Sequence, residues 1–104
     1  MSCGIALDRK AIAELCRRHR IRRMELFGSV LRDDFGPESD VDILVEFEPG
    51  ATVGLFELAG IAEEFEQLLG RRVDLVTRRA VEESENYIRR RRILKEAEPI
   101  YVEG

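Results

Sequence analysis

Residues 21–47 read IRRMELFGSVLRDDFGPESDVDILVEF, and two apolar runs in this stretch flank a polar connection. The first run, Ile21 to Phe27, predicts a short strand. Gly28-Ser29 follows it and opens a helical turn, after which residues with glycine, proline and serine predict a loop. The second run, Asp40 to Phe47, predicts another strand.

The second run alternates, so that every other residue is apolar. Successive side chains of a strand point to opposite faces, so the alternation assigns each residue to a face. One face holds Val41, Ile43, Val45 and Phe47, and the other holds Asp40, Asp42, Leu44 and Glu46. We therefore expect one buried face and one face that is acidic at its start.

The rest of the chain supplies helices and further strands around this pair. The expected elements are a helix from Asp8 to about Arg18 or His19, a helix from Leu55 to Leu69 that ends at Gly70, a strand from Arg72 to Thr77, a helix from Val81 to Ala97 and an edge strand from Ile100 to Val102. This order predicts an α/β fold, a small mixed β-sheet with flanking helices, in a single domain over residues 1–104.

Three aspartates occupy strand positions that suit a metal site. Asp40 and Asp42 lie two apart on one strand, so both carboxylates face the same side. Asp74 follows Asp42 after 31 residues, which is enough for a helical crossover that returns its strand beside the previous one. Two carboxylates about 4 Å apart repel each other by roughly 4 kcal/mol at an effective dielectric of about 20. Bound Mg²⁺ offsets this repulsion. The alternative is three exposed strand-end aspartates with no shared site.

Gly28-Ser29 is a candidate phosphate-binding turn. Glycine allows close approach to the backbone, a helix N-terminus presents N–H groups, and the serine hydroxyl is a further donor. The alternative is an ordinary turn between a strand and a helix. Arg32, one turn later, is the only cation between Met24 and Gly70, and it either reaches the same phosphate or pairs with a neighbouring acid.

Charge patterning limits the class of protein. The net charge is −4, and an acidic centre lies between two basic flanks, Arg17 to Arg23 and Arg89 to Arg92. A nucleic-acid-coating protein would be basic across its binding face, so we expect no stable nucleic-acid partner. The flanks are either solvated helix faces or surfaces for an anionic partner. No apolar run reaches the roughly 18–20 residues that span a bilayer, so we expect no membrane segment.

Cysteine and histidine usage favours a reduced compartment and argues against zinc. Cys3 and Cys16 follow no secretory signal, which predicts reduced thiols and a cytoplasmic protein. His19 is the only histidine in the sequence, so a zinc site would lack ligands.

Together these motifs resemble the nucleotidyltransferase superfamily that includes DNA polymerase β. The resemblance rests on LFGSVLR at residues 26–32, SDVDILVEF at residues 39–47 and the later Asp74, and it is greatest to the minimal nucleotidyltransferases that pair with HEPN-domain toxins. It implies a polymerase-β-like fold in which Asp40 and Asp42 hold two Mg²⁺ ions. It further implies that Asp74 holds the catalytic ion and activates the attacking hydroxyl, and that Gly28-Ser29 binds a nucleoside triphosphate.

The resemblance also implies a reaction and a partner. AMP would pass from ATP to a tyrosine hydroxyl of a HEPN toxin, with release of pyrophosphate, and this chain would be the antitoxin. Larger members carry acceptor domains, and 104 residues leave no room for one, so we expect the partner to complete the site. Two alternatives are a small-molecule nucleotidyltransferase of the aminoglycoside-modifying kind and a non-catalytic module that neutralises the toxin by contact. The motif specifies neither the base nor the number of nucleotides transferred.

Overall fold

The computed structural model describes residues 7–31, 36 and 39–103. Its elements are, in chain order, α1 (Arg9–Arg18), β1 (Ile21–Phe27), the 3₁₀ turn η1 (Gly28–Leu31), β2 (Val41–Phe47), α2 (Leu55–Leu69), β3 (Val73–Thr77), α3 (Arg78–Glu82), α4 (Tyr87–Glu96) and β4 (Glu98–Val102). Across these residues, none of the helices has the length and apolar character needed to cross a membrane.

Within the described residues, four strands form one mixed sheet in the order β3-β2-β1-β4. β1 runs antiparallel to both β2 and β4, whereas β2 runs parallel to β3. α2 makes the crossover that a parallel pair requires. β4 is an edge strand, and Pro99 is tolerated there because one side of an edge strand makes no ladder hydrogen bonds. The observed sheet confirms the expected fold class.

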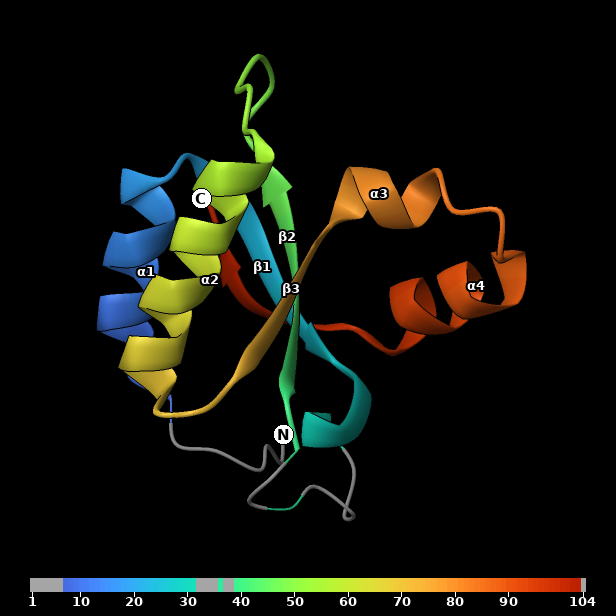
Figure 1. Cartoon of the computed structure of the whole chain (residues 1–104), viewed down its shortest axis with the longest axis horizontal. Helices are drawn as coiled ribbons and strands as arrows, with labels where there is room; N and C mark the ends of the chain where they lie inside the picture. Colours follow the sequence, from blue (N-terminus) through green and yellow to red (C-terminus); the bar gives the residue numbers. More distant parts are fainter. Residues whose placement is uncertain (1–6, 32–35, 37–38, 104) are drawn as a thin grey trace.

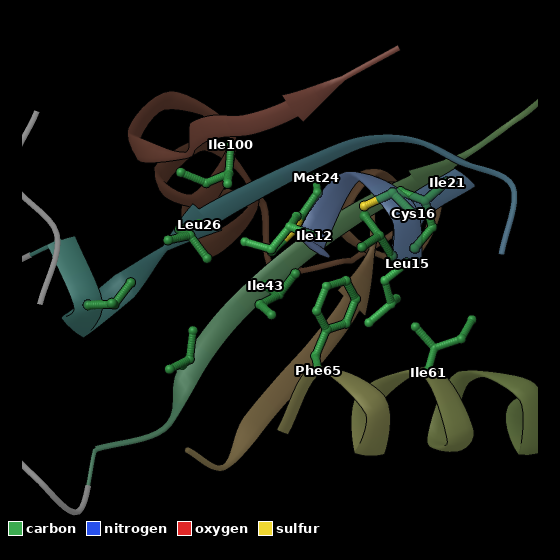
Figure 2. Close-up of a cluster of buried hydrophobic side chains, with 13 residues drawn as sticks. Ile12, Leu15, Cys16, Ile21, Met24, Leu26, Ile43, Ile61, Phe65 and Ile100 are labelled. Carbon is green, nitrogen blue, oxygen red and sulfur yellow. The ribbon is translucent and has the colours of Figure 1, made fainter. Parts of the chain in front are cut away.

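Helices lie on both sides of the sheet (Figure 1). α1 and α2 cover one face, where their apolar side chains and those of the sheet form the main core (Figure 2). The labelled members of this core are Ile12, Leu15, Cys16, Ile21, Met24, Leu26, Ile43, Ile61, Phe65 and Ile100. Glu64 of α2 adds ion pairs to Arg18 at 2.8 Å and to His19 at 2.6 Å, so His19 links two helices.

α3 and α4 lie on the other face, which the alternation of β2 did not predict to be buried. Leu44 in the middle of β2 is only 1% exposed, and it forms a second apolar cluster with Phe27, Val81 and Ile93. Asp42 lies two residues before Leu44 on the same face and is half-buried. The middle of β2 is therefore buried on both sides, because it lies between two layers of helices.

The prediction of one helix from Val81 to Ala97 is wrong, because the chain forms two helices separated by residues 83–86. α4 begins after Asn86, whose Oδ1 accepts a hydrogen bond from the backbone N–H of Arg89 at 3.1 Å. Asparagine satisfies a free N–H at a helix start and competes with helix formation elsewhere, so it favours a break here. The break lets the chain turn back, so that α4 runs roughly antiparallel to α3 (Figure 1).

Candidate active site

Gly28 lies directly after β1. The carboxylate of Asp42 lies where a Cβ of this residue would be. The φ angle of Gly28 is 76°, in the left-handed region that favours glycine. A Cβ at this position would overlap Asp42 Oδ2 and lie 3.1 Å from Asp42 Cγ. Both the backbone angle and the contact therefore require glycine, and the turn limits where the Asp42 carboxylate can lie.

Asp42 and Asp74 are register partners in the parallel pair of β2 and β3. Register partners point to the same face, and neighbouring strands lie about 4.8 Å apart. Asp42 is half-buried and Asp74 is exposed, at the end of the sheet where both strands begin. The predicted crossover is thus confirmed, and it places these two aspartates on adjacent strands.

Asp40 lies just before β2 and is ion-paired in this structure. Its Oδ1 lies 3.3 Å from Arg72 Nε, and both side chains are more than half exposed, at 51% and 74%. An exposed pair contributes at most about 1 kcal/mol, so Asp40 can exchange Arg72 for another cation at little cost. In the described part of the chain, no group of three or more His, Cys, Asp or Glu side chains is placed to hold a metal ion. One metal site shared by Asp40, Asp42 and Asp74 stays a prediction.

Ser29 is the second residue of η1, and it is half-buried. Val30 beside it is buried in the main core, which anchors the turn to the sheet. Ser29 is therefore the residue that directly follows Gly28, which contacts Asp42. Arg32, the other candidate phosphate ligand, lies outside the described residues.

A cavity of about 460 Å³ opens beside this turn. The residues that line it are Phe27, Gly28, Asp42, Arg89, Arg92, Ile93 and Glu96. Phe27 ends β1, Gly28 begins η1 and Asp42 lies near the start of β2, whereas the other four come from α4. Sites for small ligands commonly measure about 300–1,000 Å³. Gly28 and Asp42 therefore face a space that is large enough for a ligand.

The contribution of α4 to this cavity was missed by the sequence analysis. Arg89 and Arg92 are three residues apart and so share one helix face. Ile93 beside them is buried, which sets the side of α4 that faces the sheet. The signal in the sequence was Ile93, a single apolar residue beside a basic run. The expected unbroken helix, however, did not show where in the fold the face with Arg89 and Arg92 would lie.

The donor set fits a divalent cation of the Mg²⁺ type. Mg²⁺ is usually held by one or two carboxylates together with oxygens of substrate phosphates. Asp42 and Asp74 supply two carboxylates on adjacent strands, and Asp40 is a third in a weak, exposed pair. Carboxylate oxygens are hard ligands, so this set suits Mg²⁺ better than zinc.

Another cavity, of about 480 Å³, lies at the opposite end of β2. Arg78 lines it, and its Nε lies 3.8 Å from Glu46 Oε1 and 3.3 Å from Glu82 Oε2. Arg78 also reaches the buried Glu25, with Nη1 at 3.2 Å from Oε1. The three glutamates all pair with Arg78. Asp42 and Asp74 do not line this cavity, so it is not the candidate active site.

The mixed sheet, the glycine turn and the paired aspartates define a nucleotidyltransferase. The nucleotidyltransferase domain family matches residues 8–99, and the chain belongs to this family. The protein is thus an enzyme of the class that its motifs resemble.

Named relatives and solved structures agree with this assignment. Protein adenylyltransferase MntA of Thermococcus cleftensis is 44% identical over 63 residues, which cover 61% of this chain and 62% of the relative. The solved structure of a candidate minimal nucleotidyltransferase is 41% identical, with coverage of 88% of this chain and 87% of that chain and a TM-score of 0.68. A chain from the complex of a Shewanella oneidensis MNT antitoxin with a tri-AMPylated HEPN toxin is 20% identical. Its alignment covers 90% of this chain and 69% of that chain with a TM-score of 0.61, which shows a shared fold.

Proposed function

We propose that this chain transfers AMP from ATP to a tyrosine hydroxyl of a HEPN-domain toxin and thereby acts as its antitoxin. The observation that carries the proposal is the placement of Asp42. This residue contacts Gly28, is the register partner of Asp74 and lines the 460 Å³ cavity. Nucleotidyl transfer requires carboxylates for divalent cations next to a phosphate site, and this arrangement offers both.

The proposal gives each candidate residue a role. Two Mg²⁺ ions are held by Asp40, Asp42 and Asp74, and the triphosphate of ATP is bound by Gly28, Ser29 and Arg32. When bound, the ions supply charge neutralisation for the phosphates and for the attacking and leaving oxygens. The Ser29 hydroxyl donates a hydrogen bond to a phosphate oxygen, and Gly28 allows the phosphate to approach the backbone.

The transfer step exchanges one phosphorus–oxygen bond for another. The acceptor hydroxyl oxygen forms a bond to the α-phosphorus of ATP, while the bond from that phosphorus to the oxygen bridging to the β-phosphate breaks. Pyrophosphate leaves with the bonding electron pair, and the hydroxyl proton passes to the carboxylate of Asp74. Most of the rate enhancement in such a step comes from positioning and from charge stabilisation.

The proposed acceptor is supported by the similar proteins. The related MntA is a protein adenylyltransferase, and the structurally similar MNT antitoxin forms a complex with an AMPylated HEPN toxin. Asp74 is exposed in this chain, so a side chain on the surface of another protein can approach it. A protein acceptor therefore fits the access to the carboxylates.

Intact-mass spectrometry tests this function. The chain is mixed with a HEPN-domain protein from the same genome, ATP and Mg²⁺. We expect that protein to gain one or more AMP-sized increments, and we expect Asp42→Asn to abolish the gain, because the amide keeps the shape and removes the charge that holds the ions. Glu63→Gln is the matched control, since it removes one charge from an exposed position on α2.

The controls separate the alternatives. If the wild-type chain binds the HEPN protein and leaves its mass unchanged, the contact-only module replaces the enzyme proposal. If Asp42→Asn labels as well as the wild type, the assigned role of the aspartates is wrong. Labelling of an aminoglycoside, with no labelling of the protein, would favour the small-molecule alternative.

A further inference from the structure

The four consecutive arginines of α4 have different surroundings. Arg90 points back to α3, where its Nη1 donates to the carbonyl oxygens of Glu82 at 3.3 Å and Ser84 at 3.2 Å. The last carbonyls of a helix need such donors, because they lack partners within the helix. Arg90 therefore has a structural role, because it stabilises the junction between α3 and α4.

Arg89 and Arg92 have another position, since both line the cavity that contains Gly28 and Asp42. Arg91 lies between them in sequence and is exposed as they are, but it does not line that cavity. A spacing of three residues puts Arg89 and Arg92 on one face of the helix, whereas Arg91 is turned about 100° from Arg92 and about 160° from Arg89. The basic run thus directs two of its guanidinium groups toward the candidate active site.

The position of α4 is fixed by apolar packing beside the cavity. Ile93 is only 6% exposed and clusters with Phe27, Leu44 and Val81. Phe27 immediately precedes Gly28, and Phe27 and Ile93 also line the cavity. The helix that carries the two arginines is therefore packed on the face of the sheet that carries Asp42.

The ion pair of Arg92 leaves its guanidinium group able to bind an anion. Arg92 Nε lies 3.6 Å from Glu96 Oε1, in a pair whose side chains are 73% and 45% exposed. Such an exposed pair is weak, and a guanidinium carries five N–H donors, so Arg92 can bind a second anion. The fork of an arginine matches two phosphate oxygens, which makes arginine well suited to bind phosphate.

We propose that Arg89 and Arg92 bind the phosphates of the nucleotide in this cavity, so that α4 forms part of the nucleotide site. The proposal rests on the proposed function, because it takes the ligand to be a nucleoside triphosphate. It explains why a helix with a basic face lies against a turn and an aspartate that are otherwise remote from it in sequence. The same groups stabilise the pyrophosphate as it leaves.

Isothermal titration of the whole chain with Mg-ATP and Mg-free AMP tests the inference. We expect Arg89→Gln/Arg92→Gln to weaken ATP binding at least tenfold, and to weaken AMP binding much less because AMP has a single phosphate. Arg91→Gln is the matched control and should remain within twofold of the wild type. Glutamine has a helix propensity close to that of arginine, and circular dichroism checks that α4 is retained in each variant.

Each result has a defined meaning. If the wild-type chain fails to bind Mg-ATP, the proposed function fails and this inference fails with it. If the wild type binds and the double variant binds equally well, the inference is overturned while the proposed function stands. A double variant that binds ATP normally but no longer labels the partner protein also overturns it, because the arginines would then contact the acceptor. Equal loss for AMP and ATP would also overturn it, because it would exclude contacts with the β- and γ-phosphates, which AMP lacks.

Discussion

The carboxylate of Asp42 occupies the space into which a side chain at Gly28 would project. Gly28 directly follows β1, and Asp42 in β2 is the register partner of Phe27, the last residue of β1. Antiparallel pairing of the two strands therefore brings the turn and the aspartate together, although 13 residues separate them in the chain. The contact joins the proposed phosphate turn to a proposed metal ligand.

Replacing Gly28 by alanine should reduce both stability and transfer activity. A side chain in the left-handed region costs about 1–2 kcal/mol. The new Cβ must also displace Asp42, which overlaps its position. We expect the free energy of unfolding, measured by urea denaturation, to fall by about 2 kcal/mol or more. We expect AMP transfer to fall to background at a Mg²⁺ concentration that saturates the wild type.

Gly70 provides a matched control for this substitution. Its φ angle is 69°, close to that of Gly28, but a Cβ there would have no heavy atom within 4 Å beyond its chain neighbours and its own helix. Gly70→Ala should therefore cost about 1–2 kcal/mol in stability from the backbone alone and retain transfer activity. Equal losses of stability and retained transfer in both variants would show that the contact with Asp42 has no functional role.

Arg78 should be important for stability because it pairs with a buried carboxylate. Glu25 is 5% exposed in β1, and its Oε1 lies 3.2 Å from Arg78 Nη1 and 3.4 Å from Arg23 Nε. Removing one partner of a buried pair typically costs about 3–5 kcal/mol. Because Arg23 remains, we expect Arg78→Ala to lower the free energy of unfolding by about 3 kcal/mol, measured by urea denaturation.

Two further variants identify the cause of that loss. Arg79→Ala removes the neighbouring arginine, whose pair with Glu83 is exposed at 88% and 66%, and should cost at most about 1 kcal/mol. Glu25→Gln removes the buried charge, so in the double variant with Arg78→Ala the loss should be smaller than the sum by at least about 1 kcal/mol. If the losses of the two single variants simply add in the double variant, the ion pair with Glu25 is not the way in which Arg78 stabilises the fold.

The parts of the fold that could be predicted are those that local patterns determine. The helical spacing from Leu55 to Leu69 matches α2 at both ends, and Gly70 ends it in a left-handed conformation as a C-cap. The length of this crossover predicted the parallel pairing of β2 with β3, and the pairing puts Asp42 opposite Asp74. The crossover length was therefore sufficient to place these two aspartates on adjacent strands, whereas the register that puts them on one face comes from the structure.

The remaining features depend on contacts between distant segments, which a local pattern does not contain. The second layer of helices requires Val81 and Ile93 to pack on Leu44, and each is a single apolar residue in a charged stretch. The break at residues 83–86 depends on the cap at Asn86, which competes with a continuous basic helix. The position of Arg89 and Arg92 beside the cavity could be predicted only if both the second helical layer and this break were known.

Cys16 should be unreactive in the folded protein. Burial raises the pKa of its thiol from 9.0 to about 12, and the thiolate is the reactive form. In a Cys3→Ser variant, which leaves one cysteine, we expect iodoacetamide at about pH 8 to label Cys16 only after urea unfolding. Because the unfolded thiol ionises first, folding stability should also decrease as the pH rises from 9.0 toward about 12. Rapid labelling without urea would contradict the burial of Cys16 between α1 and the sheet.

The ion pair of Asp40 with Arg72 should compete with metal binding. Asp40 Oδ1 lies 3.3 Å from Arg72 Nε, so the carboxylate must leave the arginine before it can hold Mg²⁺. Opening an exposed pair costs at most about 1 kcal/mol, or about fivefold in affinity. In a magnesium titration of AMP transfer, Arg72→Gln should therefore lower the midpoint by up to about fivefold, and Asp40→Asn should raise it at least tenfold, because a ligand charge is lost. Arg79→Gln, on the exposed surface of α3, should leave the midpoint unchanged. Wild-type midpoints for both Arg72→Gln and Asp40→Asn would place Asp40 outside the metal site and leave Asp42 and Asp74 as its protein ligands.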